Sequence, residues 1–243
     1  TNTTHIEFWS EIAQYSSMTT QLFWVFNQCI YAWLIICIIL TQNDNRQIIF
    51  IWSLAMLTST FPFVGMLPFL IYKIISNTPD SISFKQSFHY FFKDICTLEN
   101  ILGGGSIGII SFIYLIGNIS AQNVDTPATS ISSPGFVFLA FLFFLIEAGL
   151  YLLAMYPYQK ANFLYYIVII ILLICPYIHV GSGVDFSMRA SIPALFVMYL
   201  LFVETFSSSI KDHKWLITIA LTLLFLVGSV TPIKEFCRTA NQT

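Results

Sequence analysis

Seven long apolar runs are the feature that most constrains what this chain folds into. A hydrocarbon core of about 30 Å is crossed by about 20 apolar residues in an α-helix. The runs that approach this length are 22–40, 48–75, 101–119, 135–156, 162–178, 186–206 and 215–230. They predict an all-α fold, a polytopic transmembrane helical bundle of about seven spans that forms a single transmembrane domain over residues 1–243.

The composition points to the same solvent. Of the 243 residues, 57% are hydrophobic and only 9% are charged. A soluble domain carries about 25% charged residues, so this chain has too little polar surface to face water. We therefore expect membrane lipid as its main partner. The formal net charge of −2 offers no basic field for a phosphate backbone, which excludes a nucleic-acid-binding protein.

Two stretches carry signs of irregular structure. The run 48–75 holds Pro62 and Pro68. A proline inside a helix removes a backbone hydrogen bond, so we expect a kink or a broken helix there. The segment 81–99 places apolar side chains at roughly helical spacing among charged ones. It fits either an amphipathic helix along the membrane surface or a tilted connector between two spans.

Lysine and arginine in the short loops predict the orientation of the spans. If the seven runs alternate in direction, one side receives Lys73, Lys85, Lys93, Lys160, Lys211 and Lys214. The other side receives Arg46, Arg189, Lys234 and Arg238. The loop 120–134 has neither Lys nor Arg and falls on this second side. The excess predicts that the first side is cytoplasmic and that Arg189 lies at the outer boundary.

The ends of the sequence are polar. The chain opens with Thr-Asn-Thr-Thr rather than Met, and residues 233–243 form a polar tail. We expect these residues to be an internal piece of a longer polypeptide, in which earlier spans precede residue 1.

No motif indicates a cofactor or a metal ion. Dinucleotide, P-loop and zinc-protease patterns do not occur, and the five cysteines form no CxxC pair. Cys29, Cys37 and Cys175 fall inside apolar runs, where a free cysteine acts as a small apolar side chain. The glycines at 103–105 open an apolar run without the Lys-Ser/Thr of a phosphate loop. We interpret them as a site of close helix packing.

Two glutamates lie within the apolar runs, where an ionisable side chain is costly unless it is paired or hydrated. Glu147 is near the middle of the run 135–156. It is either a functional group, such as a proton site or a contact to a lipid-linked head group, or a buried carboxyl that is protonated or bonded to a neighbouring helix. Glu204 is near the end of its run, where its side chain can extend to water.

The stretch 179–196 is the richest in polar groups. Asp185 and Arg189 are four residues apart, so on a helix they share a face and form a pair. A helix that started at Ser191 would be about 24 Å long, whereas one from Asp185 would reach about 33 Å and cross the core. We therefore expect a helix from Asp185 that is loosened by Pro193.

An arginine at this boundary suggests a binding site for an anion. A guanidinium grips a phosphate through two parallel N–H bonds. One hypothesis is that Arg189 holds the phosphate or pyrophosphate of a lipid-linked donor, with Asp185, His179, Ser191 and Glu147 as further substrate-binding residues. The alternative is an Asp185–Arg189 ion pair that only anchors the helix, with His179 a solvated interfacial side chain.

The string DFSMRASIPALF at 185–196 resembles bacterial polytopic membrane proteins of the GT-C glycosyltransferase type. The string GGGSIGIISFIYLIGN at 103–118 also looks like a span of those proteins. The resemblance covers the later half of such a protein. It implies a multi-pass protein of the bacterial inner membrane that takes a sugar from polyprenyl phosphate at the outer face.

The sequence departs from this type in one respect. GT-C enzymes carry an acidic catalytic residue in their first outer loop, and no segment here is identified with that loop. Asp44 and Asp125 fall outside in the predicted topology, but neither has a motif around it. We therefore expect the catalytic residue upstream of this chain. A transporter or flippase, with Glu147 and the proline-broken run 48–75 along its path, and a non-catalytic membrane subunit remain alternatives.

Overall fold

The fold was analysed in a computed structural model, which describes residue 7 and residues 9–78, 90–121, 134–178 and 184–240. Every regular element in these ranges is a helix or a helical turn, as the apolar runs predict. His179 and most of the segment 81–99 lie outside the described residues. The expected surface helix therefore stays a prediction. The described end of that segment contains a short π-helical turn, η3 (Phe91–Ile95).

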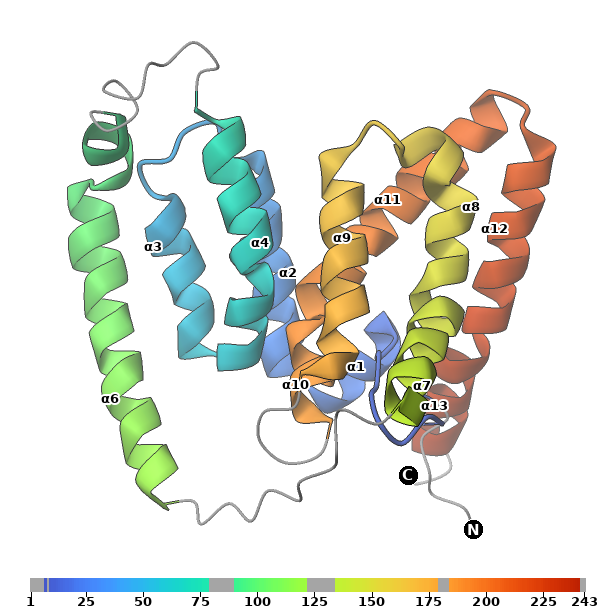
Figure 1. The fold of residues 1–243 in the computed structure, drawn as a ribbon, viewed down its shortest axis with the longest axis horizontal. Helices are drawn as coiled ribbons and strands as arrows, with labels where there is room; N and C mark the ends of the chain where they lie inside the picture. The colour runs from blue at the N-terminus through green and yellow to red at the C-terminus, as the bar shows by residue number, and fades with distance from the viewer. Residues whose placement is uncertain (1–6, 8, 79–89, 122–133, 179–183, 241–243) are drawn as a thin grey trace. The chain divides into compact units, whose positions relative to one another are not determined.

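The chain divides into two compact units (Figure 1). Unit 1 joins Thr1–Phe26 to Thr126–Thr243, and unit 2 is Asn27–Asp125. Unit 2 is therefore inserted in the sequence between two parts of unit 1. Whether the two form the single transmembrane domain expected from the sequence stays a prediction.

Unit 1 is a bundle of long apolar helices that run side by side (Figure 1). Its elements are α1 (Met18–Trp24), α7 (Pro134–Phe144), η5 (Leu145–Gly149), α8 (Leu150–Gln159), α9 (Phe163–Ile174), η6 (Cys175–Tyr177), α10 (Asp185–Ala190), α11 (Ile192–Lys211), α12 (Trp215–Gly228) and α13 (Val230–Ala240). The π-helical turn η5 joins α7 and α8 into one rod. The polar tail at 233–243 is part of α13 as far as Ala240, so most of it is helical.

Helix α11 is the centre of unit 1 and packs against α8, α9 and α12. Its buried side chains include Ala194, Val197, Leu201 and Thr205, which recur at the three- and four-residue spacing of one helix face. Small side chains in this stripe allow the neighbouring helices to approach closely. This packing fixes α10, which precedes α11 and meets it at Ser191.

The two ends of unit 1 differ in their charged residues. At one end, the Tyr158 hydroxyl donates to Asp212 Oδ2 at 2.9 Å, and Lys214 Nζ lies 4.6 Å from the centre of the Tyr158 ring. This end carries the lysines of the loops after α8 and α11. At the other end η6 contacts α10, and α1 contacts α13. Arg189 and Arg238 lie on these elements, so the basic residues of unit 1 fall into two separate groups, as the sequence predicts.

Unit 2 contains α2 (Phe26–Thr41), which begins at the boundary with unit 1. In the same unit α3 (Ile48–Ser53) packs against the rod formed by η4 (Glu99–Gly104) and α6 (Gly105–Ala121). The close packing predicted for the glycine triplet is confirmed at two of its three positions. A Cβ added to Gly103 would lie 2.5 Å from the Phe50 ring, and one on Gly104 would lie 3.5 Å from Ile49. A Cβ added to Gly105 would have no described atom within 4 Å outside its own stretch of helix.

The run 48–75 folds as a helical hairpin rather than as the single span predicted from its length. It consists of α3 (Ile48–Ser53), the 3₁₀ turn η2 (Leu54–Leu57) and α4 (Thr60–Ser76) (Figure 1). The predicted break exists, but it lies at Thr58 and Ser59, before either proline. Ser59 has an extended backbone, and starting α4 at Thr60 puts Pro62 in the first turn, where a missing N–H costs little.

The hairpin corrects the predicted position of Arg46. The chain just before α3 returns to the end of α4, because Asn45 Nδ2 donates to the Ile74 carbonyl at 3.1 Å. Arg46 lies 3.7 Å from Asp94, beside Lys93. The alternation rule placed Arg46 opposite Lys73 and Lys93, and this is wrong because the run 48–75 reverses direction. The three basic residues of unit 2 that the structure describes, Arg46, Lys73 and Lys93, lie at one end.

Among the residues that the structure describes, four helices are long and apolar enough to cross a membrane, and they make this a multi-pass membrane protein: Glu99–Ile116, Pro134–Gln159, Ile192–Lys211 and Trp215–Ala240. They coincide with four predicted spans, 101–119, 135–156, 186–206 and 215–230. The remaining runs form the shorter apolar helices Phe26–Thr41, Ile48–Leu57, Thr60–Ser76 and Phe163–Tyr177. The count of about seven spans therefore stays a prediction.

Candidate functional site

The predicted pair of Asp185 and Arg189 is present in α10. The helix begins at Asp185 as predicted, and Arg189 occupies its last turn, but it ends at Ala190. The length argument for it was wrong, because α11 continues to Lys211 and is long enough to cross the core without α10. Arg189 Nη2 lies 3.5 Å from Asp185 Oδ1, and the two side chains are 29% and 34% exposed. The buried Nε of Arg189 has no hydrogen-bond partner among the described residues. The guanidinium is therefore oriented by one carboxylate, while a donor remains for another acceptor.

Ser191 is not exposed beside the partly exposed side chains of Asp185 and Arg189. It sits at the junction of α10 and α11 and is fully buried. Its hydroxyl donates to the Met188 carbonyl at 3.2 Å, within the local helical turn. Pro193 follows at the second position of α11, where a proline is tolerated. The predicted loosening of the helix thus takes the form of a break at Ser191, and its hydroxyl is already used inside the helix.

Glu147 lies in the π-helical turn η5, in the middle of the long rod. π-Helical turns inside α-helices are frequent at functional sites. Its Oε1 accepts a hydrogen bond from Trp9 Nε1 at 2.7 Å. Phe143, on the turn before, packs against Trp9 at a ring distance of 6.0 Å and against Tyr15 at 4.7 Å. Glu147 is therefore held by residues that precede α1, and not by a neighbouring helix as one alternative expected.

The residues before α1 form a structure that the sequence did not predict. We call residue 7 together with residues 9–17 the N-terminal segment. It has little regular structure, yet it contacts three separate helices. Trp9 reaches Glu147, the Tyr15 hydroxyl donates to the Leu172 carbonyl of α9, and the Gln14 backbone N–H donates to Ser187 Oγ of α10 at 3.4 Å. The N-terminal segment thus connects the helix of Glu147 to the helix of Arg189.

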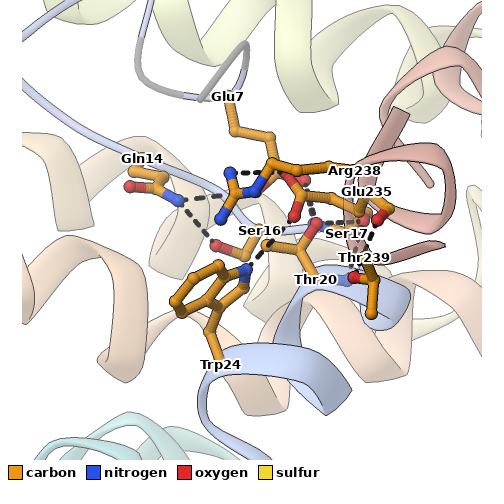
Figure 2. Close-up of polar contacts among 9 residues, drawn as sticks. All are labelled: Glu7, Gln14, Ser16, Ser17, Thr20, Trp24, Glu235, Arg238 and Thr239. Atoms are coloured by element: carbon orange, nitrogen blue, oxygen red, sulfur yellow. Dashed lines mark hydrogen bonds and ion pairs between the residues drawn. The ribbon is translucent and has the colours of Figure 1, made fainter. Parts of the chain in front are cut away.

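The carboxylate of Glu7 organises the next part of this segment (Figure 2). Its Oε1 accepts from the Ser17 backbone N–H at 2.9 Å and from Thr20 Oγ1 at 2.8 Å. Its Oε2 accepts from Gln14 Nε2 at 3.4 Å. The side chain is only 5% exposed, so these donors replace the water that a carboxylate otherwise requires.

A second buried carboxylate, Glu235 of α13, lies in the same group of polar contacts (Figure 2). It is 4% exposed and accepts from Trp24 Nε1 at 3.2 Å. Arg238 Nη1 lies 3.5 Å from Glu235, and its guanidinium stacks 4.7 Å from the Trp24 ring. The i,i+3 spacing of Glu235 and Arg238 was a signal available in the sequence. It indicates a polar inner face on α13, which α1 covers.

Within the described residues, no three His, Cys, Asp or Glu side chains converge in a way that would hold a metal ion. No protein-family model matches the chain, and neither a curated protein nor a solved structure matches it. The function is therefore argued from the geometry of unit 1 and from the residues of α10.

Proposed function

We propose that this multi-pass membrane protein binds the phosphate or pyrophosphate of a lipid-linked sugar through Arg189. In this proposal it is the donor-binding part of a glycosyltransferase in the bacterial inner membrane, and Arg189 acts at the outer face. The observation that carries the proposal is the state of the guanidinium, which is partly exposed and is oriented by Asp185 through a contact of 3.5 Å that is too long to occupy it fully.

The ion pair leaves room for a stronger acceptor. Charge-assisted hydrogen bonds between nitrogen and oxygen are about 2.7–2.9 Å long, whereas Arg189 and Asp185 are 3.5 Å apart. Asp185 therefore orients the guanidinium without saturating it. Two oxygens of a phosphate group have the geometry to accept from two guanidinium N–H groups at once, which a lysine in the same place would not reproduce.

The location favours a phosphate that is attached to a lipid. α10 leads directly into the candidate span Ile192–Lys211, so an anion bound at Arg189 lies where head groups meet hydrocarbon. The sugar and the polyprenyl chain are inferred from the resemblance of residues 185–196 to GT-C proteins. The general base that would activate an acceptor hydroxyl is expected outside these residues, so the chain itself is proposed to bind the donor.

Binding of a polyprenyl phosphate to the purified chain in nanodiscs tests this proposal. Arg189→Lys should weaken binding by about tenfold or more, the loss expected for one charged hydrogen bond. Asp185→Asn should leave binding unchanged or stronger, because it removes the competing carboxylate. The corresponding polyprenol without phosphate serves as the control ligand and should not respond to either variant.

The anchor alternative predicts a different pattern. If the pair only holds α10 in place, Arg189→Lys leaves polyprenyl phosphate binding unchanged. In that case Asp185→Asn and Arg189→Gln lower the yield of folded protein to the same extent. Either result would remove the phosphate-binding role from Arg189.

A further inference from the structure

The helices of the hairpin in unit 2 are too short to cross a bilayer. At rises of about 1.5 and 2.0 Å per residue, α3 with η2 spans about 17 Å and α4 about 25 Å, against a core of about 30 Å. Both nevertheless expose large apolar side chains, with Leu57 58%, Val64 42% and Ile71 49% exposed. Such surfaces require hydrocarbon around them, so the hairpin belongs inside the membrane although neither arm reaches across it.

Buried amides hold the two open ends of the hairpin together. Asn45 is fully buried and donates from Nδ2 to the Ile74 carbonyl. Asn77 Nδ2 donates to Asn45 Oδ1 at 3.1 Å, and Asn100 Nδ2 donates to the Asn45 carbonyl at 3.0 Å. These contacts tie the residues before α3, the end of α4 and the start of η4 into one polar layer. The chain therefore enters and leaves the hairpin at the same level.

The tip of the hairpin has polar partners of its own. Ser59 Oγ donates to Gln28 Oε1 of α2 at 3.3 Å, and Thr58 Oγ1 donates to the Ala55 carbonyl at 3.0 Å. Non-helical backbone is tolerated at membrane depth only where protein or water satisfies its polar groups. The backbone N–H groups of Thr58 and Ser59 both donate to the Ala55 carbonyl, at 3.2 and 3.0 Å, so the turn satisfies these donors within the protein. This fits a turn that ends within the bilayer.

We propose that residues 48–76 form a re-entrant hairpin, which enters and leaves the membrane from the cytoplasmic side and stops inside it. The basic residues support the return of the chain to the same side. If the run 48–75 returns and the other predicted runs cross the membrane, connectivity puts seven of the ten on one side: Arg46, Lys73, Lys85, Lys93, Lys160, Lys211 and Lys214. Only Arg189, Lys234 and Arg238 fall on the other. A single span over this run gave six against four, so a run that returns obeys the positive-inside rule better.

Cysteine accessibility in the full chain tests the hairpin. The five native cysteines are replaced by serine or alanine. Arg46→Cys, Lys73→Cys and Ser59→Cys are then introduced one at a time, with Lys214→Cys as the reference for the cytoplasmic side. A membrane-impermeant maleimide is applied to vesicles of each orientation. Positions 46 and 73 should be labelled only from the side that labels position 214, and position 59 from neither side until the membrane is dissolved and the protein denatured.

Each other outcome overturns the proposal in its own way. Labelling of positions 46 and 73 from opposite sides would make the run one complete span. Labelling of position 59 from the far side would make it two complete spans, and labelling from the cytoplasmic side would put the tip outside the membrane. If Ser59→Cys disturbs folding through its bond to Gln28, Leu57→Cys reports on the same depth without removing a hydrogen bond. None of these outcomes depends on Arg189.

Discussion

The hydroxyl of Tyr15 donates a hydrogen bond to the backbone carbonyl of Leu172 in α9. In an α-helix this carbonyl would accept from the residue four positions later, but that residue is Pro176, which has no N–H. Burial raises the pKa of the Tyr15 phenol well above its usual value, which keeps the hydroxyl protonated as a donor. The N-terminal segment thus satisfies a carbonyl that a proline leaves unpaired in a helix far along the sequence.

Tyr15→Phe should therefore lower the free energy of unfolding by about 1–3 kcal/mol, the cost of leaving a buried carbonyl unsatisfied. The loss should shrink when Pro176 is replaced by alanine, because the restored N–H then pairs with the Leu172 carbonyl. A double-mutant cycle, measured by denaturation in mixed micelles, reports this coupling.

Tyr166→Phe provides the matched control. The Tyr166 hydroxyl also donates to a backbone carbonyl, that of Lys160, but it does so at an exposed position. Its removal should cost less than Tyr15→Phe, and the cost should not depend on Pro176. Equal costs of Tyr15→Phe with and without the proline would show that the two residues are not coupled.

The contact between Trp9 and Glu147 predicts which substitutions expose the N-terminal segment to proteases. Glu147→Gln keeps an oxygen that accepts from the indole N–H, so the segment should stay in place. Glu147→Leu and Trp9→Phe each remove the bond and should increase the rate of proteolytic cleavage within residues 9–17. Limited proteolysis in detergent measures this rate, with Trp215→Phe as a substitution at an exposed tryptophan far from the segment. Faster cleavage of Glu147→Gln would instead mean that the negative charge holds the segment.

Local sequence features predicted much of unit 1. About 20 consecutive apolar residues indicate a spanning helix from length alone, and the described part of unit 1 contains three such helices. The four-residue spacing of Asp185 and Arg189 likewise predicted their pairing. These features depend on residues close together in the sequence, so no knowledge of the tertiary structure was needed to find them.

The N-terminal segment and the hairpin depend on contacts that hydropathy does not report. Trp9 and Glu147 are far apart in the sequence, and nothing around either residue indicates the other. The run 48–75 is mostly apolar, so its length suggested one span, although the chain reverses at the polar residues Thr58 and Ser59 inside it. The contacts that close its open end come from polar residues outside the run, the side-chain amides of Asn45, Asn77 and Asn100.

The glycine triplet at the start of the α6 rod yields a prediction with an internal control. A methyl group on Gly103 would lie 2.5 Å from the ring of Phe50, so Gly103→Ala should destabilise the protein by about 1–3 kcal/mol through overpacking. Gly105 has open space around its Cα, and there Gly→Ala should be neutral or stabilising by up to about 1 kcal/mol. Thermal unfolding in detergent compares the two variants. Similar effects at both positions would mean that η4 does not pack on α3 through Gly103.

Gly228 and Tyr151 give a sharper case, because the sign of the effect should reverse. The Tyr151 hydroxyl donates to the Leu224 carbonyl at 2.6 Å, and a Cβ on Gly228 would lie 2.5 Å from its oxygen. Gly228→Ala should therefore displace the phenol and destabilise the protein by about 1–3 kcal/mol.

In a Tyr151→Phe background the obstructing oxygen is gone, and the nearest remaining ring atom lies 3.7 Å from the added Cβ, an ordinary contact. There Gly228→Ala should be neutral or stabilising, because alanine is the better helix former at the end of α12. Denaturation of the four proteins of this cycle in mixed micelles measures the reversal. If Gly228→Ala lowers the free energy of unfolding equally in both backgrounds, the Tyr151 hydroxyl is not what excludes a side chain at position 228. The backbone conformation of Gly228 would then explain the need for glycine.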